Sequence, residues 1–311
     1  MNISREKVSV VRVPFGLGGA VLGAERGPDS IMAAGLLDEL KRFAPHGVSS
    51  DEIRLPPSPA IESVEDRAAP AADGGMIKFE RQVREMCERT ADRAFRAALY
   101  GNFPLVLGGD HSVAIGTLAG MSRAYDKLGV IWIDAHGDLN TEQTSPSGNA
   151  HGMVLAVASG LAAFKQTDIG QTRQLIRKRN IVLVGSRDLD EGEKTFIRRH
   201  GIHCFTMADI DKLGMEEVMN SALMLAGRES DGIHVSFDMD ALDPLEAPGV
   251  GTPVPGGLTF REARLAMEQL SMSRAIASMD IVEVNPAKDS QGRTPRLAVE
   301  LAAAFMGKRL I

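Results

Sequence analysis

Short runs of β-branched and other apolar residues alternate with longer amphipathic stretches along the chain. The runs predict strands at residues 8–13, 103–108, 129–134, 180–185, 233–240 and 275–284. Such alternation is typical of a parallel sheet covered by helices on both faces. We therefore expect an α/β fold, a three-layer α/β/α sandwich with a mainly parallel central sheet, formed by one domain over residues 1–311.

The helical stretches carry recognisable end signals. In the segment 76–101 the apolar residues lean to one side, and Gly101 is suited to the position just beyond the helix end. Thr259 and Glu262 have the spacing of a capping box, which predicts a helix start. The Gly-rich segment 16–23 lacks the G-x-G-x-x-G spacing, so we interpret it as a turn before a helix near Pro28 and not as a phosphate-binding loop.

Net charge, the length of apolar runs and the cysteine count argue against several classes of protein. A net charge of -6 and a pI near 5.7 argue against a nucleic-acid binder, which normally has a basic face. No run approaches the roughly 20 apolar residues of a membrane span, and the N-terminus has no signal-peptide pattern. Cys87 and Cys204 form no disulfide framework, so we expect reduced thiols in a cytoplasmic protein. The Pro-, Ala- and acid-rich segment 56–75 is expected to be a surface loop.

Acidic residues and histidines follow directly after three of the predicted strands. They are Asp110 and His111; Asp134, His136 and Asp138; and Asp238 and Asp240. Ligand groups of parallel sheets gather beyond the carboxyl ends of the strands, so these side chains should meet at one edge. If the strand geometry continues, residues two apart also face the same way.

This set of side chains predicts a metal centre. Four carboxylates and two imidazoles without a cysteine suit manganese best, with cobalt, nickel or iron as alternatives. Six ligands exceed what one catalytic ion usually takes from a protein, so two ions sharing carboxylates are expected. Taken singly, an Asp-x-His after a strand is more often a capped turn, and a residue such as His136 is more often a core histidine. We interpret His234 as a core histidine. The coincidence at three strand ends favours the metal interpretation.

The same residues lie in motifs that resemble the arginase/agmatinase (ureohydrolase) family of binuclear manganese enzymes. "GGDHS" (108–112), "DAHGD" (134–138) and "SFDMDALDP" (236–244) are similar to its three metal-binding signatures. Segments 185–193, 249–262 and 280–286 also match, and the segment 138–153 resembles arginases more than agmatinases. The resemblance implies hydrolysis of L-arginine to L-ornithine and urea by a hydroxide that bridges two Mn²⁺ ions per subunit.

The resemblance also implies a role for each site residue. One ion would be held by His111, Asp134, Asp138 and Asp238, and the other by His136 and Asp240, with Asp134 and Asp238 shared. Asn140, Ser147 and Asn149 would bind the α-carboxylate of the substrate, and Asp190 and Glu193 its α-ammonium. Glu283 would orient the guanidinium, Thr252 would support that end, Asp138 would pass on a proton, and His151 would shuttle protons. A homo-oligomer, trimer or hexamer, is implied as well.

Other functions remain open at this point. An agmatinase, a guanidinobutyrase or an N-hydroxyarginine amidinohydrolase would share the metal ligands and differ at the substrate end. A metal-binding relative without catalysis is a further alternative. Gly137 departs from the larger residue of many relatives, and its side-chain position is expected to point away from the ligands.

Overall fold

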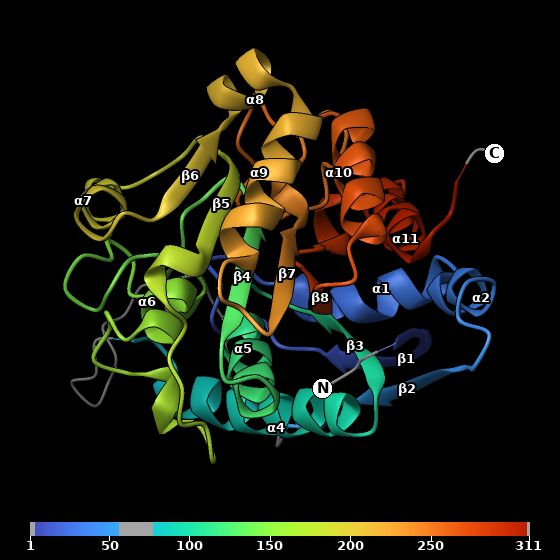
Figure 1. The fold of residues 1–311 in the computed structure, drawn as a ribbon, viewed down its shortest axis with the longest axis horizontal. Coiled ribbons are helices and arrows are strands. Elements are labelled where there is room, and N and C mark those ends of the chain that lie inside the picture. Colours follow the sequence, from blue (N-terminus) through green and yellow to red (C-terminus); the bar gives the residue numbers. More distant parts are fainter. Residues whose placement is uncertain (1–3, 56–76, 310–311) are drawn as a thin grey trace.

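The computed structural model describes residues 4–55 and 77–309, so the loop expected at 56–75 lies outside the described residues. Within them, eight strands form one sheet in the order β2-β1-β3-β8-β7-β4-β5-β6, and every pairing is parallel (Figure 1). The strands are β1 (Ser4–Val13), β2 (Val48–Glu52), β3 (Asn102–Gly108), β4 (Leu128–Ile133), β5 (Ile181–Ser186), β6 (His203–Thr206), β7 (Gly232–Asp238) and β8 (Ile276–Val282).

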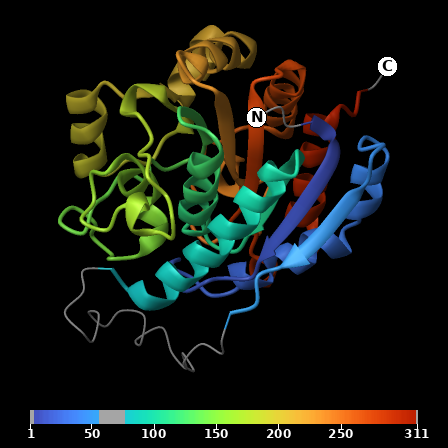
Figure 2. The same ribbon diagram turned by 60° about the horizontal axis from the view of Figure 1, so that its bottom comes forward.

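Helices cover both faces of this sheet. One face packs against α1 (Gly27–Ala33), α2 (Leu36–Lys41), α8 (Met207–Leu213), α9 (Met215–Gly227), α10 (Phe260–Met272) and α11 (Arg293–Met306). The other packs against α4 (Glu80–Leu99), α5 (Val113–Ala124) and α6 (Val154–Ser159), and α7 (Glu191–His200) lies beside β6. The tilted view shows α4 and α5 lying across the sheet (Figure 2). The predicted three-layer α/β/α architecture is confirmed.

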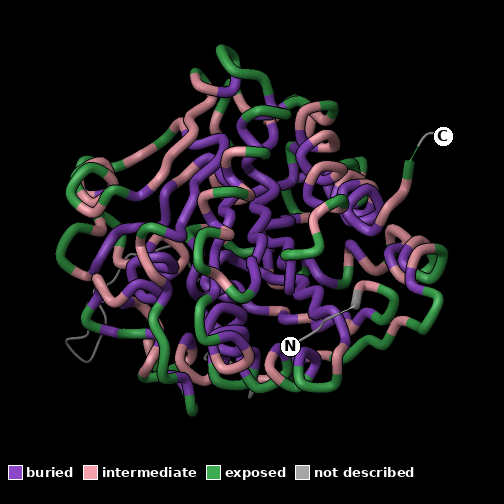
Figure 3. The backbone as a smooth tube through the Cα atoms, in the orientation of Figure 1, coloured by how far each residue is buried: buried purple, intermediate pink, exposed green. Residues whose placement is uncertain are grey.

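Alternation along each strand divides the core between the two faces. In β4, Ile131 and Ile133 pack on the α9–α10 side, whereas Val130 and Trp132 pack on the α4–α5 side. All the residues of β4 are buried, because both faces are covered. Figure 3 shows this burial as a continuous core through the sheet, with exposed chain at the periphery.

The six predicted strands are confirmed, and two edge strands were missed. β2 is largely exposed and β6 is only half-buried, so neither has the apolar run that marks an interior strand. The capping box at Thr259 and Glu262 is confirmed, and so is the left-handed Gly101 beyond α4, with a φ of 74°. No helix of the described residues is both long enough and apolar enough to cross a membrane.

Candidate active site

The predicted ligands meet at the carboxyl edge of the sheet, where β3, β8, β7 and β4 lie side by side. At three strand ends an aspartate closes the same small turn by accepting the backbone N–H two residues ahead. Asp134 accepts from His136 at 2.7 Å, Asp238 from Asp240 at 2.7 Å, and Asp110 from Ser112 at 3.0 Å. Aspartate favours this local turn over strand pairing, which ends each strand at the edge.

The expected continuation of strand geometry beyond β4 and β7 is therefore wrong. The two-residue spacing does not act through continued strand geometry, because β4 ends at Ile133 and Asp138 has a left-handed φ of 49°. Asp240 likewise lies in a short 3₁₀ turn, Met239–Ala241. The side chains converge because the turns fold the chain back at the sheet edge.

Two groups of candidate ligands share Asp134. His111, Asp134 and Asp238 form one group and Asp134, His136 and Asp240 the other, with the ligand atoms of each group within 4.8 Å of one another. The Nδ1 atom of His111 lies 3.0 Å from oxygens of both Asp134 and Asp238. The same atom lies 3.1 Å from Asp138, so all six predicted metal residues are close together. Whether Asp238 also serves the second group stays a prediction.

Crowding of buried acids perturbs their protonation. Burial and the charge of Asp134 raise the pKa of Asp240 to about 6. Burial and the neighbouring Asp240 raise the pKa of Asp238 well above its usual range. In both cases the charged carboxylate is disfavoured where no cation compensates it.

The hydrogen bonds around His111 test whether a cation fits here. Its Nε2 atom lies 2.8 Å from the hydroxyl of Ser236, and that hydroxyl itself donates to Asp280. The Ser236 oxygen therefore accepts the Nε2 proton, and in the neutral ring Nδ1 presents a lone pair to the carboxylates. Among the described residues, His111 Nδ1 and Asp138 Oδ2 are buried without a hydrogen-bond partner. A metal ion fits this donor set, because it would satisfy both atoms.

His151 and Glu283 form a pair beside the ligands. The Nδ1 atom of His151 lies 3.1 Å from Glu283 Oε1, which also accepts the backbone N–H of His111 at 2.9 Å. Burial alone would lower the pKa of His151, but Glu283 raises it to about 9. His151 therefore carries a proton at neutral pH and stays next to a carboxylate.

Three of the residues expected at the substrate end, Asn140, Asp190 and Glu193, meet at the start of α7. Asn140 donates to the carboxylate of Asp190 at 2.7 Å, and Asp190 caps the helix. Glu193 accepts the N–H groups of Asp190 at 2.8 Å and Leu139 at 3.1 Å. Burial raises the pKa of Glu193 to about 7.

A pocket of about 140 Å³, which we call the acidic pocket, connects the candidate metal ligands with the residues of the substrate end. Most of the predicted residues line it: His111, His136, Asp138, Asn140, Ser147, His151, Asp190, Glu193, Asp238, Asp240 and Thr252. Asp134, Asn149 and Glu283 are buried and are not among its lining residues. Thr252 donates to Asp240 at 3.0 Å, so it contacts a candidate ligand directly.

Several residues of the site were not identified from the sequence. Trp132 donates to Asp134 at 3.0 Å and stacks on the His111 ring at a centroid distance of 4.1 Å. Asp188 lines the pocket, with its carboxylate 4.0 Å from His136. Arg187 donates to the carbonyl oxygens of Asp240 at 2.8 Å and Val254 at 2.7 Å, and so braces the loop that carries Thr252. Trp132 lies two residues before Asp134, and this spacing is a signal that the sequence offered.

Gly137 packs closely against Leu189 and Glu193. A Cβ atom at this position would lie 2.9 Å from Leu189 and 3.0 Å from the Glu193 carboxylate. The position thus points away from the candidate metal ligands and toward a residue of the substrate end. Glycine here leaves room for Glu193.

Comparisons with known proteins agree with this geometry. The model of the "Arginase family" matches residues 6–307. The chain belongs to the arginase family. It is 44% identical to an arginase of Bacillus caldovelox over 304 residues, which is 98% of this chain and 99% of the relative. The predicted enzyme class, a ureohydrolase, is confirmed.

Solved structures of this family have the same fold. The native structure of the Bacillus caldovelox arginase superposes with a TM-score of 0.90 at 42% identity, covering 98% of this chain and 99% of that one. An Entamoeba histolytica arginase in complex with L-ornithine has a TM-score of 0.88 at 31% identity, covering 99% and 100%. The arginase fold therefore extends over nearly the whole chain.

Proposed function

We propose that this member of the arginase family is a binuclear manganese enzyme that hydrolyses L-arginine to L-ornithine and urea. The observation that carries the proposal is the pair of candidate ligand groups that share Asp134, whose other members all line the acidic pocket. The ions would be held by His111, Asp134, Asp138 and Asp238, and by His136 and Asp240. When bound, two divalent ions would supply a water of lowered pKa as a nucleophile at neutral pH.

The protein's own groups would then handle the substrate guanidinium and the protons. Glu283 uses Oε1 for His111 and His151, which leaves Oε2 beside Gly251 to orient the planar cation. Asp138 would take a proton from the attacking water and pass it to the departing amine. His151, protonated at neutral pH, would exchange protons with solvent.

The other end of the pocket suits an α-amino acid. Asn140, Ser147 and Asn149 would donate hydrogen bonds to the α-carboxylate, directly or through water. Asp190 and Glu193 would receive the α-ammonium. The Entamoeba histolytica relative was solved with L-ornithine, which is the proposed product here.

A substrate panel tests the proposal. Protein stripped with a chelator and reconstituted with Mn²⁺, Co²⁺, Ni²⁺ or Fe²⁺ is assayed for urea release from L-arginine, agmatine, guanidinobutyrate and N-hydroxyarginine. We expect the highest kcat/KM for L-arginine with Mn²⁺. Preference for a substrate without the α-carboxylate would instead assign another ureohydrolase, and two bound ions without any turnover would indicate a non-catalytic relative.

A pair of variants tests the substrate end separately. Ser147→Ala and Asp190→Ala should chiefly raise the KM for L-arginine, because their contacts are with the part of the substrate that does not react. Ser50→Ala and Asp92→Ala, which lie outside the acidic pocket, serve as matched controls. An unchanged KM in both test variants would contradict the proposed recognition.

The remaining proposals rest on the sequence pattern and, for the oligomeric state, on the family resemblance. We propose that residues 1–311 form one catalytic domain, that the enzyme is a homo-oligomer, trimer or hexamer, and that it is cytoplasmic. Analytical ultracentrifugation of the purified full chain tests the oligomeric state.

A further inference from the structure

Asp110 is a buried carboxylate that has no part in the proposed reaction. It lies between the end of β3 and His111, and none of its surface is exposed. Its Oδ2 atom accepts the N–H of Gly18 at 2.8 Å. Its Oδ1 atom accepts both the N–H and the hydroxyl of Ser112. One carboxylate thus joins the end of β3 to the N-terminal Gly-rich segment.

Gly18 carries this connection onward to His151. While its N–H donates to Asp110, its carbonyl oxygen accepts the backbone N–H of His151 at 3.0 Å. Two consecutive hydrogen bonds therefore link the Asp110 carboxylate to the main chain of the proposed proton shuttle. The residues Gly16–Gly19 that form this turn are all buried.

The partner of His151 is anchored at the same place. The backbone N–H of Glu283 donates to the carbonyl oxygen of Gly109 at 2.8 Å, one residue before Asp110. Both members of the His151–Glu283 pair are therefore held by the segment Gly109–Asp110. Their side chains meet at 3.1 Å between these two backbone anchors.

Close packing explains why this turn is glycine-rich. A Cβ atom on Gly18 would lie 2.3 Å from the Ser112 hydroxyl, and one on Gly109 would lie 1.6 Å from the carbonyl oxygen of Phe15. Any side chain at these two positions would push the segments apart. The motif that superficially suggests a phosphate-binding loop serves the approach of two backbone segments.

We infer that Asp110 and the turn Gly16–Gly19 form a clamp that positions His151 against Glu283, which makes Asp110 a positioning residue. Its catalytic consequence rests on the proposed function, whereas the clamp itself is a structural claim.

The first experiment measures Asp110→Asn in the Mn²⁺-loaded enzyme. An amide oxygen cannot accept from all three donors, because the NH₂ group replaces one acceptor. We expect kcat to fall about tenfold to a hundredfold, with the KM for L-arginine changed less than about threefold. Because Asp110 adjoins His111, the bound manganese is counted in parallel and should stay unchanged.

A double-variant cycle separates positioning from a general structural effect. In a His151→Asn background, Asp110→Asn should lower kcat by less than about a further twofold, because the side chain that Asp110 positions has been removed. Gly19→Ala provides a milder second variant, since its Cβ would lie 3.0 Å from Asp110 Cβ. Gly227→Ala is the control, with its nearest contact at 3.6 Å. An equal loss in both backgrounds would overturn the clamp.

Hydrogen exchange gives a readout that needs no turnover. The His151 amide should exchange at least about tenfold faster in Asp110→Asn than in the parent, because its acceptor Gly18 is released. Unchanged exchange would also overturn the clamp. If the parent hydrolyses no guanidino compound but the exchange rises, the clamp stands and the proposed function falls.

Discussion

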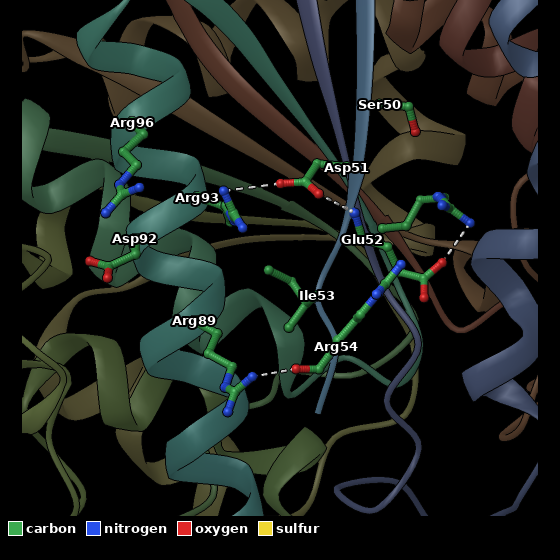
Figure 4. A pocket seen from close by; sticks show the side chains of 10 residues that line it. Ser50, Asp51, Glu52, Ile53, Arg54, Arg89, Asp92, Arg93 and Arg96 are labelled. Atoms are coloured by element: carbon green, nitrogen blue, oxygen red, sulfur yellow. Dashed lines mark hydrogen bonds and ion pairs between the residues drawn. The ribbon is translucent and has the colours of Figure 1, made fainter. Parts of the chain in front are cut away.

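The acidic pocket and a larger hollow near the sheet edge differ in how their charges are compensated. The larger one, the arginine hollow, has a volume of about 590 Å³ and lies between β2 and α4. It is lined by Arg12, Arg54, Arg89, Arg93 and Arg96 and by the acids Asp51, Glu52 and Asp92, together with Ser50 and Ile53. Figure 4 shows Arg89 and Arg93 of α4 reaching toward Arg54 and Asp51 at the end of β2.

Most of the charge in the arginine hollow is paired within the chain. Arg93 lies 3.1 Å from Asp51, and Arg12 lies 2.8 Å from Glu52. Arg89 donates to the carbonyl oxygen of Arg54 (Figure 4). These contacts join the edge strand β2 to β1 and α4, so a structural role accounts for them.

The acidic pocket is smaller, but the acids that line it outnumber the histidines that could balance their charge. Its metal-site aspartates are buried, and two of its buried atoms, His111 Nδ1 and Asp138 Oδ2, have no hydrogen-bond partner among the described residues. In the arginine hollow Arg12 Nε also has none, but the same guanidinium pairs with Glu52. Leaving such groups buried is costly without a cation. The comparison teaches that unmatched buried charge locates this site, whereas volume does not.

The strongest test of this contrast replaces one acid in each hollow. Asp238→Asn should reduce kcat/KM for L-arginine about a thousandfold, which corresponds to about 4 kcal/mol of transition-state stabilisation. The same change should raise the thermal midpoint of the metal-free protein, because the pKa of Asp238 shows that its charge is disfavoured there. Asp51→Asn, in the arginine hollow, should leave urea release unchanged.

The interpretation requires both results for Asp238→Asn, the lower kcat/KM and the higher thermal midpoint of the metal-free protein. Metal analysis, urea detection and calorimetry on the stripped protein supply them. A metal-free Asp238→Asn protein that melts below the parent would show that the acids are held by something other than a bound cation.

Proton transfer in the acidic pocket gives the next largest effect. His151→Asn should lower kcat about a hundredfold while the bound manganese stays constant. In the parent, kcat/KM should decline as the pH rises through the pKa of His151, which its contact with Glu283 raises above the usual value. A pH profile of the Mn²⁺-loaded enzyme checks this. A decline that persists unchanged in His151→Asn would assign it to another group.

The sequence predicted the chemistry of the site better than its geometry. Residue types at strand ends indicated which side chains would meet as candidate ligands, because parallel strands place their carboxyl ends at one edge. The strand order was not predictable, since β8 lies between β3 and β7 only through contacts of residues far apart in the chain. The turns at Asp134 and Asp238 were misjudged because extended chain and tight turn share the two-residue spacing.

The supporting contacts were the hardest to foresee. Asp110 meets Gly18, and His111 meets Ser236, across 92 and 125 residues of sequence. A local pattern contains no information about such pairs. β2 was missed for a related reason, because its stability depends on pairing with β1 and its own residues are mostly polar.

Without bound metal, the free energy of unfolding should depend on pH through the acids of the acidic pocket. In the folded protein the pKa of Asp240 is about 6, whereas in the unfolded chain it is about 4. The protonated carboxyl therefore contributes its whole stabilisation of the folded state below about pH 4. That stability is lost as the pH rises through about 6. The stripped protein should therefore have a lower denaturant midpoint at pH 7.5 than at pH 5.5. Bound cations keep Asp240 ionised, so the reconstituted protein should not show this decrease of the denaturant midpoint. An equal decrease in the stripped and the reconstituted protein would contradict the assignment.

The smallest effect is expected in the arginine hollow. Arg93→Ala removes a half-exposed ion pair with Asp51, and such pairs contribute roughly 0–1 kcal/mol. The free energy of unfolding, measured by urea titration of the Mn²⁺-loaded protein, should fall by no more than this, and kcat/KM should not change. Arg93→Lys, which keeps the charge, is the matched control. A clear loss of activity in Arg93→Ala alone would mean that this hollow communicates with the acidic pocket, and the distinction drawn between the two would fail.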